Sequence, residues 1–132
     1  MDPLGEQVVR IFLAAALSSF IGIEREKSHK PAGLRTHVLV SIASCLSSLI
    51  AVYYYPQFVG QILAAVITGI GFLGAGSIIF GHRNVHGLTT AASIWLVAIL
   101  GIAVGVGAYF LSVVFTLISL LFLRIKKIER KL

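Results

Sequence analysis

The sequence predicts an all-α, polytopic membrane protein with five transmembrane helices, an N-terminus outside and a C-terminus in the cytoplasm. No Asp, Glu, Lys or Arg occurs between Arg35 and Arg83, or between Arg83 and Arg124. Each of these apolar tracts is long enough for two membrane crossings of about 20 residues. The 132-residue chain is also 58% hydrophobic, and a soluble domain of this size could not bury such tracts. The composition therefore favours one small membrane domain over residues 1–132.

The distribution of charge fixes the expected orientation. A formal net charge of +6 would suggest nucleic acid as the partner of a soluble protein, but here the basic residues flank apolar tracts. With five crossings, every Lys and Arg except Arg10 falls on one side of the membrane. Basic loops mark the cytoplasmic side. We therefore expect the lipid bilayer, and no nucleic acid, as a partner.

The first helix is expected to begin at Pro3, after an Asp2 cap. Glu6 and Arg10 are four residues apart, so they can pair on one face while Arg10 extends outward. Because Met1 to Glu6 carries acids in place of a basic leader, we expect no cleaved signal peptide.

Polar or glycine-rich breaks separate the remaining helices. A charged connection follows the first helix, tyrosines before Pro56 resemble an interfacial belt, and a short polar loop surrounds Arg83. Gly101, Gly105 and Gly107 mark the last turn. The five helices are expected at about residues 3–23, 36–55, 58–80, 88–104 and 107–123.

Small residues recur at helical spacing, which allows helices to approach closely in lipid. These stripes are Ala14, Ser18 and Gly22; Ala43, Ser47 and Ala51; Ala65 and Gly69; and Gly101 and Gly105. We interpret them as packing surfaces within the bundle, with self-association as the alternative. The single cysteine, Cys45, is expected to be a small packed residue.

The segment GIGFLGAG, from Gly69 to Gly76, contains four glycines in eight residues. Each glycine costs a helix roughly 1 kcal/mol relative to alanine. Two explanations are open: neighbouring helices press against this stretch, or the helix is partly unwound and offers carbonyls to a ligand.

Glu24 is the acid closest to the apolar part of the first helix. Together with Glu26, Asn84 and Thr89 it could offer oxygen ligands to a hard cation such as Mg²⁺. The alternative is a structural ion pair between Glu24 and Arg25 or Arg35. No recognisable nucleophile and base motif is present, so we expect no enzyme activity, and no cofactor beyond Mg²⁺ as a ligand or substrate.

Four segments together resemble the MgtC/SapB family of inner-membrane proteins. They are GIERE at 22–26, PAGLRTH at 31–37, GIGFLGAG at 69–76 and GLTTAASIW at 87–95. The resemblance covers essentially the whole chain and corresponds to the family's membrane domain, without the C-terminal soluble domain of larger members. It implies a multi-pass protein of the cytoplasmic (inner) membrane, linked to growth under magnesium limitation and, in pathogens, to virulence.

The resemblance also implies which residues matter. Carried over by motif, they are Glu24, Arg25, Gly33, Arg35, Thr36, Gly71, Gly74, Gly76, Gly87, Thr89 and Thr90, with Asn84 from the adjoining loop. The chain departs from the family at Tyr55, where an acid often precedes the proline, and at His86, where a basic residue is common.

The function expected from this resemblance is magnesium homeostasis or low-magnesium adaptation, through regulation of other membrane proteins. The family's implied partners include the F-type ATP synthase, and a homodimer is a further expectation. The alternative is a small transporter or channel for magnesium or another ion, with a pathway near Glu24 and the glycine-rich third helix.

Overall fold

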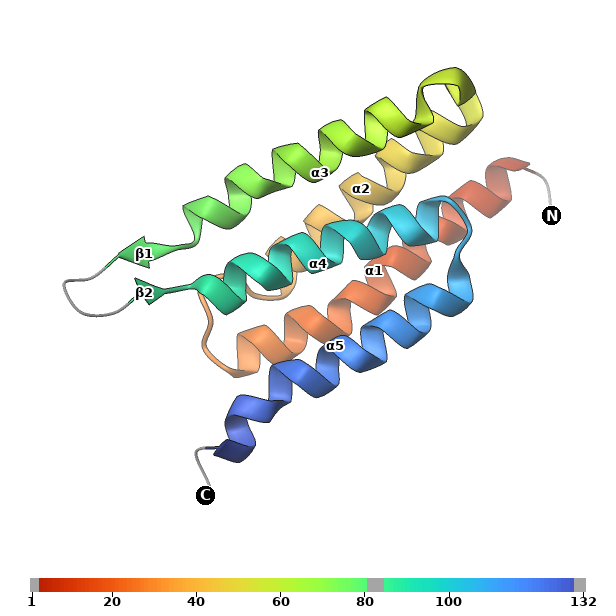
Figure 1. Cartoon of the computed structure of the whole chain (residues 1–132). Coiled ribbons are helices and arrows are strands. Elements are labelled where there is room, and N and C mark those ends of the chain that lie inside the picture. The colour runs from red at the N-terminus through yellow and green to blue at the C-terminus, as the bar shows by residue number, and fades with distance from the viewer. Residues whose placement is uncertain (1–2, 81–84, 130–132) are drawn as a thin grey trace.

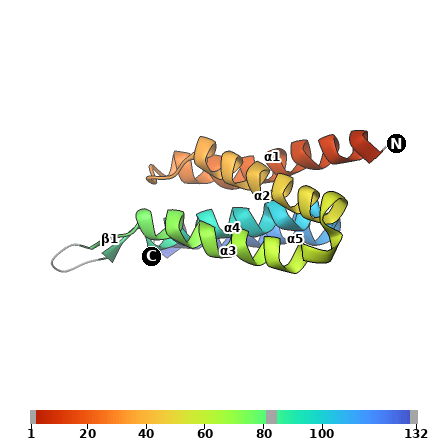
Figure 2. The same ribbon diagram turned by 90° about the horizontal axis from the view of Figure 1, so that it is seen from above.

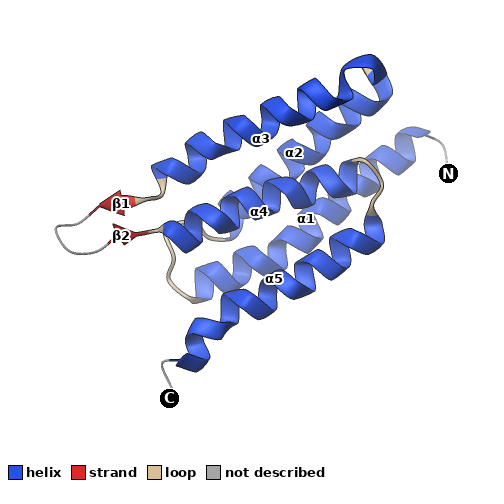
Figure 3. Ribbon diagram, viewed as in Figure 1, coloured by secondary structure: helices blue, strands red, loops and turns tan. Residues whose placement is uncertain are grey.

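The computed structural model describes residues 3–80 and 85–129 and contains five α-helices. The helices are α1 (Pro3–Lys27), α2 (Leu34–Tyr54), α3 (Val59–Gly76), α4 (Leu88–Gly105) and α5 (Tyr109–Glu129). A 3₁₀ turn, η1 (Pro56–Phe58), joins α2 to α3. Two-residue strands β1 (Ile79–Phe80) and β2 (Val85–His86) pair antiparallel between α3 and α4, and Figure 3 shows how little of the chain they occupy. The prediction of an all-α protein with five helices is confirmed.

The five helices lie in two layers. Figure 2 shows α1 and α2 in one layer and α3, α4 and α5 in the other. Helix α4 contacts each of the other four helices. The two ends of the chain lie at opposite ends of the bundle (Figure 1).

Four helices, α1 to α4, are long and apolar enough to cross a membrane. The apolar part of α5, Tyr109–Ile125, is shorter. At 1.5 Å per residue it extends about 25 Å, which is near the lower limit for a crossing.

Three expected helix boundaries differ from the structure by four residues or more, and one of them is the end of α5, which continues past residue 123 to Glu129. Helix α1 continues past residue 23 to Lys27, because its charged last turn consists of good helix formers. Helix α3 ends at Gly76, before the expected residue 80. Its glycines weaken the helix, and the chain then enters β1. Gly87, the N-cap residue just before α4, has a φ of 90°, a conformation that residues with a side chain rarely adopt.

The tightest packing in the core is between α2 and α4. A Cβ added at Gly105 would lie 2.6 Å from the Ser48 Cβ and 2.8 Å from the Cys45 carbonyl oxygen, and one at Gly101 would overlap the Ser41 carbonyl. The expectation that Gly101 and Gly105 form a packing surface is therefore confirmed. Cys45 is fully buried and free, as expected.

The small residues of the other helices divide between core and surface. Ala14, Ser18 and Gly22 of α1 are buried, as expected. On α2 the expected stripe is confirmed only at Ala51, which is fully buried. Ala43 is exposed and Ser47 half-buried, and the buried serines of this helix are Ser41, Ser44 and Ser48. Ala65 and Gly69 of α3 are exposed.

Arg10 ties α1 to the turn between α4 and α5. It pairs with Glu6, as expected, but its Nη1 donates a hydrogen bond of 2.7 Å to the Gly105 carbonyl. The rings of Tyr53 and Tyr109 lie 6.0 and 5.5 Å from its guanidinium carbon. The expectation that Arg10 extends outward is wrong, because its side chain is only 11% exposed.

Candidate functional site

The candidate site lies where α1 ends and where α2 and α4 begin, at one end of the bundle (Figure 1). Three of the four sequence segments that point to function meet here: 22–26, 31–37 and 87–95. The close approach of α1 and α2 at Gly22 brings the first two together. A Cβ at Gly22 would be 2.8 Å from the Leu34 Cα and 3.3 Å from the His37 Cβ.

Glu26 holds the start of α2. Its Oε2 accepts a hydrogen bond of 2.8 Å from the Leu34 backbone N–H, one of the amides that a helix leaves unsatisfied at its N-terminus. Gly33 makes this possible, because a Cβ there would lie 2.8 Å from the same carboxylate oxygen. This contact gives both Glu26 and Gly33 a structural role at the start of α2.

Glu24 and Arg25 form a buried ion pair at the end of α1. The Arg25 Nε lies 3.2 Å from the Glu24 Oε2, and the two side chains are 3% and 10% exposed, respectively. Glu24 Oε1 accepts a hydrogen bond of 2.9 Å from the Ser28 hydroxyl. The structure thus contains the ion pair that the sequence offered as the alternative to cation binding.

The geometry of this pair leaves polar atoms unsatisfied. Glu24 Oε2, Arg25 Nε and Arg25 Nη1 are buried and make no hydrogen bond to the described residues. Although the nitrogen and oxygen are close, the N–H does not point at the carboxylate. Each such group costs about 1–3 kcal/mol, and isolated unsatisfied groups are uncommon outside functional sites.

His37 connects α2 to α4 beside this pair. Its Nδ1 lies 2.7 Å from the Gly33 carbonyl and its Nε2 lies 2.9 Å from the Ser93 hydroxyl. Because a carbonyl only accepts, Nδ1 carries the proton and donates it. The Ser93 hydroxyl also lies 2.8 Å from the Thr90 carbonyl, and it can donate its single proton either to this carbonyl or to His37 Nε2. His37 is fully buried, and sequence reasoning did not select it although it ends the PAGLRTH segment.

The remaining residues expected at the site are less closely joined. Thr90 is buried and takes part in the His37 network through its carbonyl, whereas Thr89 is exposed. Arg35 is exposed and Thr36 half-buried in the first turn of α2. Asn84 lies outside the described residues.

Of the four expected cation ligands, Glu24 and Glu26 make side-chain contacts within the described residues. Glu26 contacts α2, while Glu24 contacts Ser28 and Arg25. Within residues 3–80 and 85–129, no three His, Cys, Asp or Glu side chains are placed to hold a metal ion. A cation site at Glu24, Glu26, Asn84 and Thr89 remains a prediction.

The glycine-rich segment has a different environment. Gly74 packs near the Ala91 carbonyl, where an added Cβ would be 3.5 Å away. Gly69, Gly71 and Gly76 have no described atom within 4 Å of an added Cβ, and α3 is a continuous helix through Gly76. Thus Gly74 alone of these four glycines has a neighbour, at an ordinary van der Waals distance, and the helix is not unwound.

Comparison with known proteins places the chain in a family. The profile of the MgtC family matches residues 11–131. This chain belongs to the MgtC family. The match covers both the candidate site and the glycine-rich helix α3, and together with the apolar helices it makes the chain a multi-pass membrane protein.

Curated relatives of the MgtC family are similar along most of the chain. The putative magnesium transporter YhiD of Escherichia coli (strain K12) is 39% identical over 129 residues, covering 91% of this chain and 60% of that protein. Protein SapB of Bacillus subtilis (strain 168) is 36% identical over 136 residues, covering 93% and 58%. Protein MgtC of Salmonella typhimurium (strain LT2) is 37% identical over 113 residues, covering 86% and 49%.

The chain therefore spans between 49% and 60% of the length of these relatives. No solved structure matches it.

Proposed function

We propose that this MgtC-family protein is a non-enzymatic component of the cytoplasmic (inner) membrane that serves magnesium homeostasis by binding other membrane proteins. The link to magnesium rests on the family and on the Escherichia coli relative described as a putative magnesium transporter. The binding role rests on one observation in this chain, the open glycine face of α3.

Three glycines of α3, Gly69, Gly71 and Gly76, lack side chains for a reason that no described neighbour explains. Gly69 and Gly76 are seven residues apart, so they lie on the same side of the helix and form the open glycine face, whereas Gly71 lies on the opposite side. Helix α3 lies at the edge of the bundle (Figure 1), and Gly74 is its one buried residue among those described. Each glycine costs about 1 kcal/mol in a helix. In lipid, exposed glycines allow the backbone of another helix to approach closely, so a partner helix would offset this cost.

An ion pathway is the second candidate function. It is favoured by the description of the Escherichia coli relative and by the buried Glu24 Oε2 without a hydrogen bond. The α2–α4 contact argues against a pathway between these helices, because Gly101 and Gly105 meet the α2 backbone directly. In this proposal Mg²⁺ is a ligand or the regulated ion, and no other cofactor takes part.

The partner can be another membrane protein, such as the F-type ATP synthase implied by the family resemblance, or a second copy of the chain. A double variant, Gly69→Leu with Gly76→Leu, fills the open glycine face without touching the described core. We expect this variant to reach the membrane in normal amounts, to keep its unfolding temperature, and to fail to support growth of a deletion strain at low magnesium.

The matched control is Leu117→Ala with Leu121→Ala, on an exposed part of α5. It should support growth like the wild type. Full growth support by the double glycine variant would contradict the proposal.

A further inference from the structure

Helices α1 and α2 pack closely at one end and separate at the other. They are in backbone contact near Gly22 and Leu34. Further along, the Ser41 hydroxyl still reaches the Ala14 carbonyl, at 3.3 Å. Beyond this point the helices diverge and leave an open pocket of about 410 Å³. Its lining residues are Gln7, Leu46, Leu49, Ile50, Tyr54 and Tyr55.

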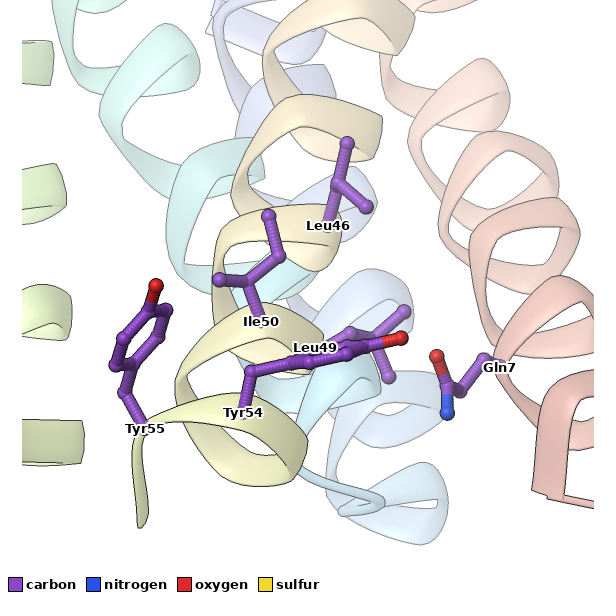
Figure 4. A pocket seen from close by; sticks show the side chains of 6 residues that line it. All are labelled: Gln7, Leu46, Leu49, Ile50, Tyr54 and Tyr55. Carbon is purple, nitrogen blue, oxygen red and sulfur yellow. The ribbon is translucent and has the colours of Figure 1, made fainter. Parts of the chain in front are cut away.

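The polarity of this pocket changes along the helix axis. Leu46, Ile50 and Tyr54 are four residues apart, so they follow one face of α2 over about 12 Å. Figure 4 shows Leu46 and Ile50 on successive turns and the Tyr54 ring extending towards Gln7 of α1, with its hydroxyl nearest that side chain. The inner part of the pocket is lined by aliphatic side chains, and the end nearest the helix terminus carries the Gln7 amide and the Tyr54 hydroxyl. The Tyr55 hydroxyl lies on the other side of α2, level with Ile50.

This gradient matches that of a phospholipid at the same depth, whose chain is apolar and whose ester region accepts hydrogen bonds. Tyrosine at the end of a transmembrane helix lies at this boundary. The lining contains no charged residue, so the pocket suits the glycerol and ester region rather than a charged headgroup.

We propose that the pocket between α1 and α2 is a binding site for one phospholipid. Its acyl chain lies on Leu46, Leu49 and Ile50. The Gln7 amide and the Tyr54 hydroxyl donate hydrogen bonds to the ester oxygens. The site is independent of the open glycine face, which lies on α3.

Native mass spectrometry of the full chain, extracted from membranes in mild detergent, tests this site. We expect a wild-type species that retains one phospholipid, identified by its mass. Leu46→Trp and Ile50→Trp fill the pocket from partly exposed positions, so each should reduce the lipid-bound fraction about tenfold. Gln7→Leu with Tyr54→Phe keeps the shape of the pocket and should reduce that fraction by a smaller factor.

The matched control is Leu117→Trp on exposed α5, which should retain the lipid. Circular dichroism and a single elution peak establish that each variant is folded. Two filling variants are used so that the test can still be made if one of them does not fold. The proposal is overturned if the wild type retains no lipid, if both filling variants retain it, or if the bound mass is that of a free fatty acid or of detergent.

Discussion

At the scale of single residues, the buried pair of Glu24 and Arg25 is expected to have a large effect on the free energy of unfolding. Both are almost entirely buried, and part of each lacks a hydrogen bond within the described residues. Removing one partner of a buried ion pair leaves an unpaired charge and costs about 3–5 kcal/mol, whereas replacing both can be neutral or stabilising. A comparison of single and double variants can therefore distinguish the contribution of the ion pair to stability from a role of Glu24 alone.

Glu24→Gln should lower the free energy of unfolding by about 3 kcal/mol, because the Arg25 guanidinium then stays buried without its counter-charge. Adding Arg25→Met to this variant should recover most of the loss. Chemical denaturation in detergent, followed by circular dichroism, measures both values. Equal stability of the single variant and the wild type would mean that the ion pair does not support the fold.

His37 is the second residue whose loss should be costly. His37→Ala removes the bonds to Gly33 and Ser93 and leaves a cavity, so we expect a loss of roughly 3 kcal/mol in unfolding free energy. Ser93→Ala should cost about 1 kcal/mol. Leu39→Ala, at an exposed position of the same helix, is the control and should have little effect in the same denaturation experiment. A His37 variant as stable as this control would refute the assigned role.

Among the elements, α3 and α4 use glycine in opposite ways. Gly105 lies against the α2 backbone, while Gly69 is open. The sequence alone did not separate the two cases, since both helices show small residues at similar spacing. The difference arises from which helix lies beside each face.

The same substitution at these two sites should have opposite effects. Gly105→Leu forces α2 and α4 apart and should cost at least about 3 kcal/mol of stability. Gly69→Leu should leave the isolated protein unchanged or stabilise it by up to about 1 kcal/mol, because leucine is a better helix former. Unfolding temperatures of the two variants, measured side by side, give the comparison. Equal destabilisation would show that the face of α3 around Gly69 is packed in the monomer.

The positions of the helices could be predicted from the sequence more fully than the contacts between them. Charge-free tracts, Pro56 and the polar segments located all five helices, because membrane insertion depends on composition along the chain. The phase of α2 was not predictable, since serine and alanine occur on several of its faces and only its neighbours decide that Ser41 and Ser48 face inward. Likewise, nothing local to His37 indicates that it meets Ser93, 56 positions further along the chain.

At the scale of the whole molecule, the described charges gather at one end. The last turn of α1, the start of α2 and the end of α5 carry Arg25, Lys27, Arg35 and Arg124, and these ends lie together in Figure 1. Arg10 lies nearer the opposite end, at the turn between α4 and α5. Because basic residues prefer the cytoplasmic side of a membrane, we propose that the first end faces the cytoplasm.

Cysteine labelling of intact cells tests this orientation. In a Cys45→Ala background, Gln57→Cys lies in η1 and His29→Cys lies in the connection between α1 and α2. An impermeant maleimide added from outside should label position 57 and not position 29, and permeabilised cells should show labelling at both. The reverse pattern in intact cells would invert the proposed topology.

The central claim is that the protein acts on magnesium through partners and does not carry the ion itself. Magnesium uptake into sealed proteoliposomes that contain the purified, folded chain tests this most directly, with empty liposomes as the control. We expect the wild type to give uptake equal to that of empty liposomes. Saturable uptake that Glu24→Gln abolishes, while that variant still inserts and folds, would contradict it and place Glu24 on an ion pathway.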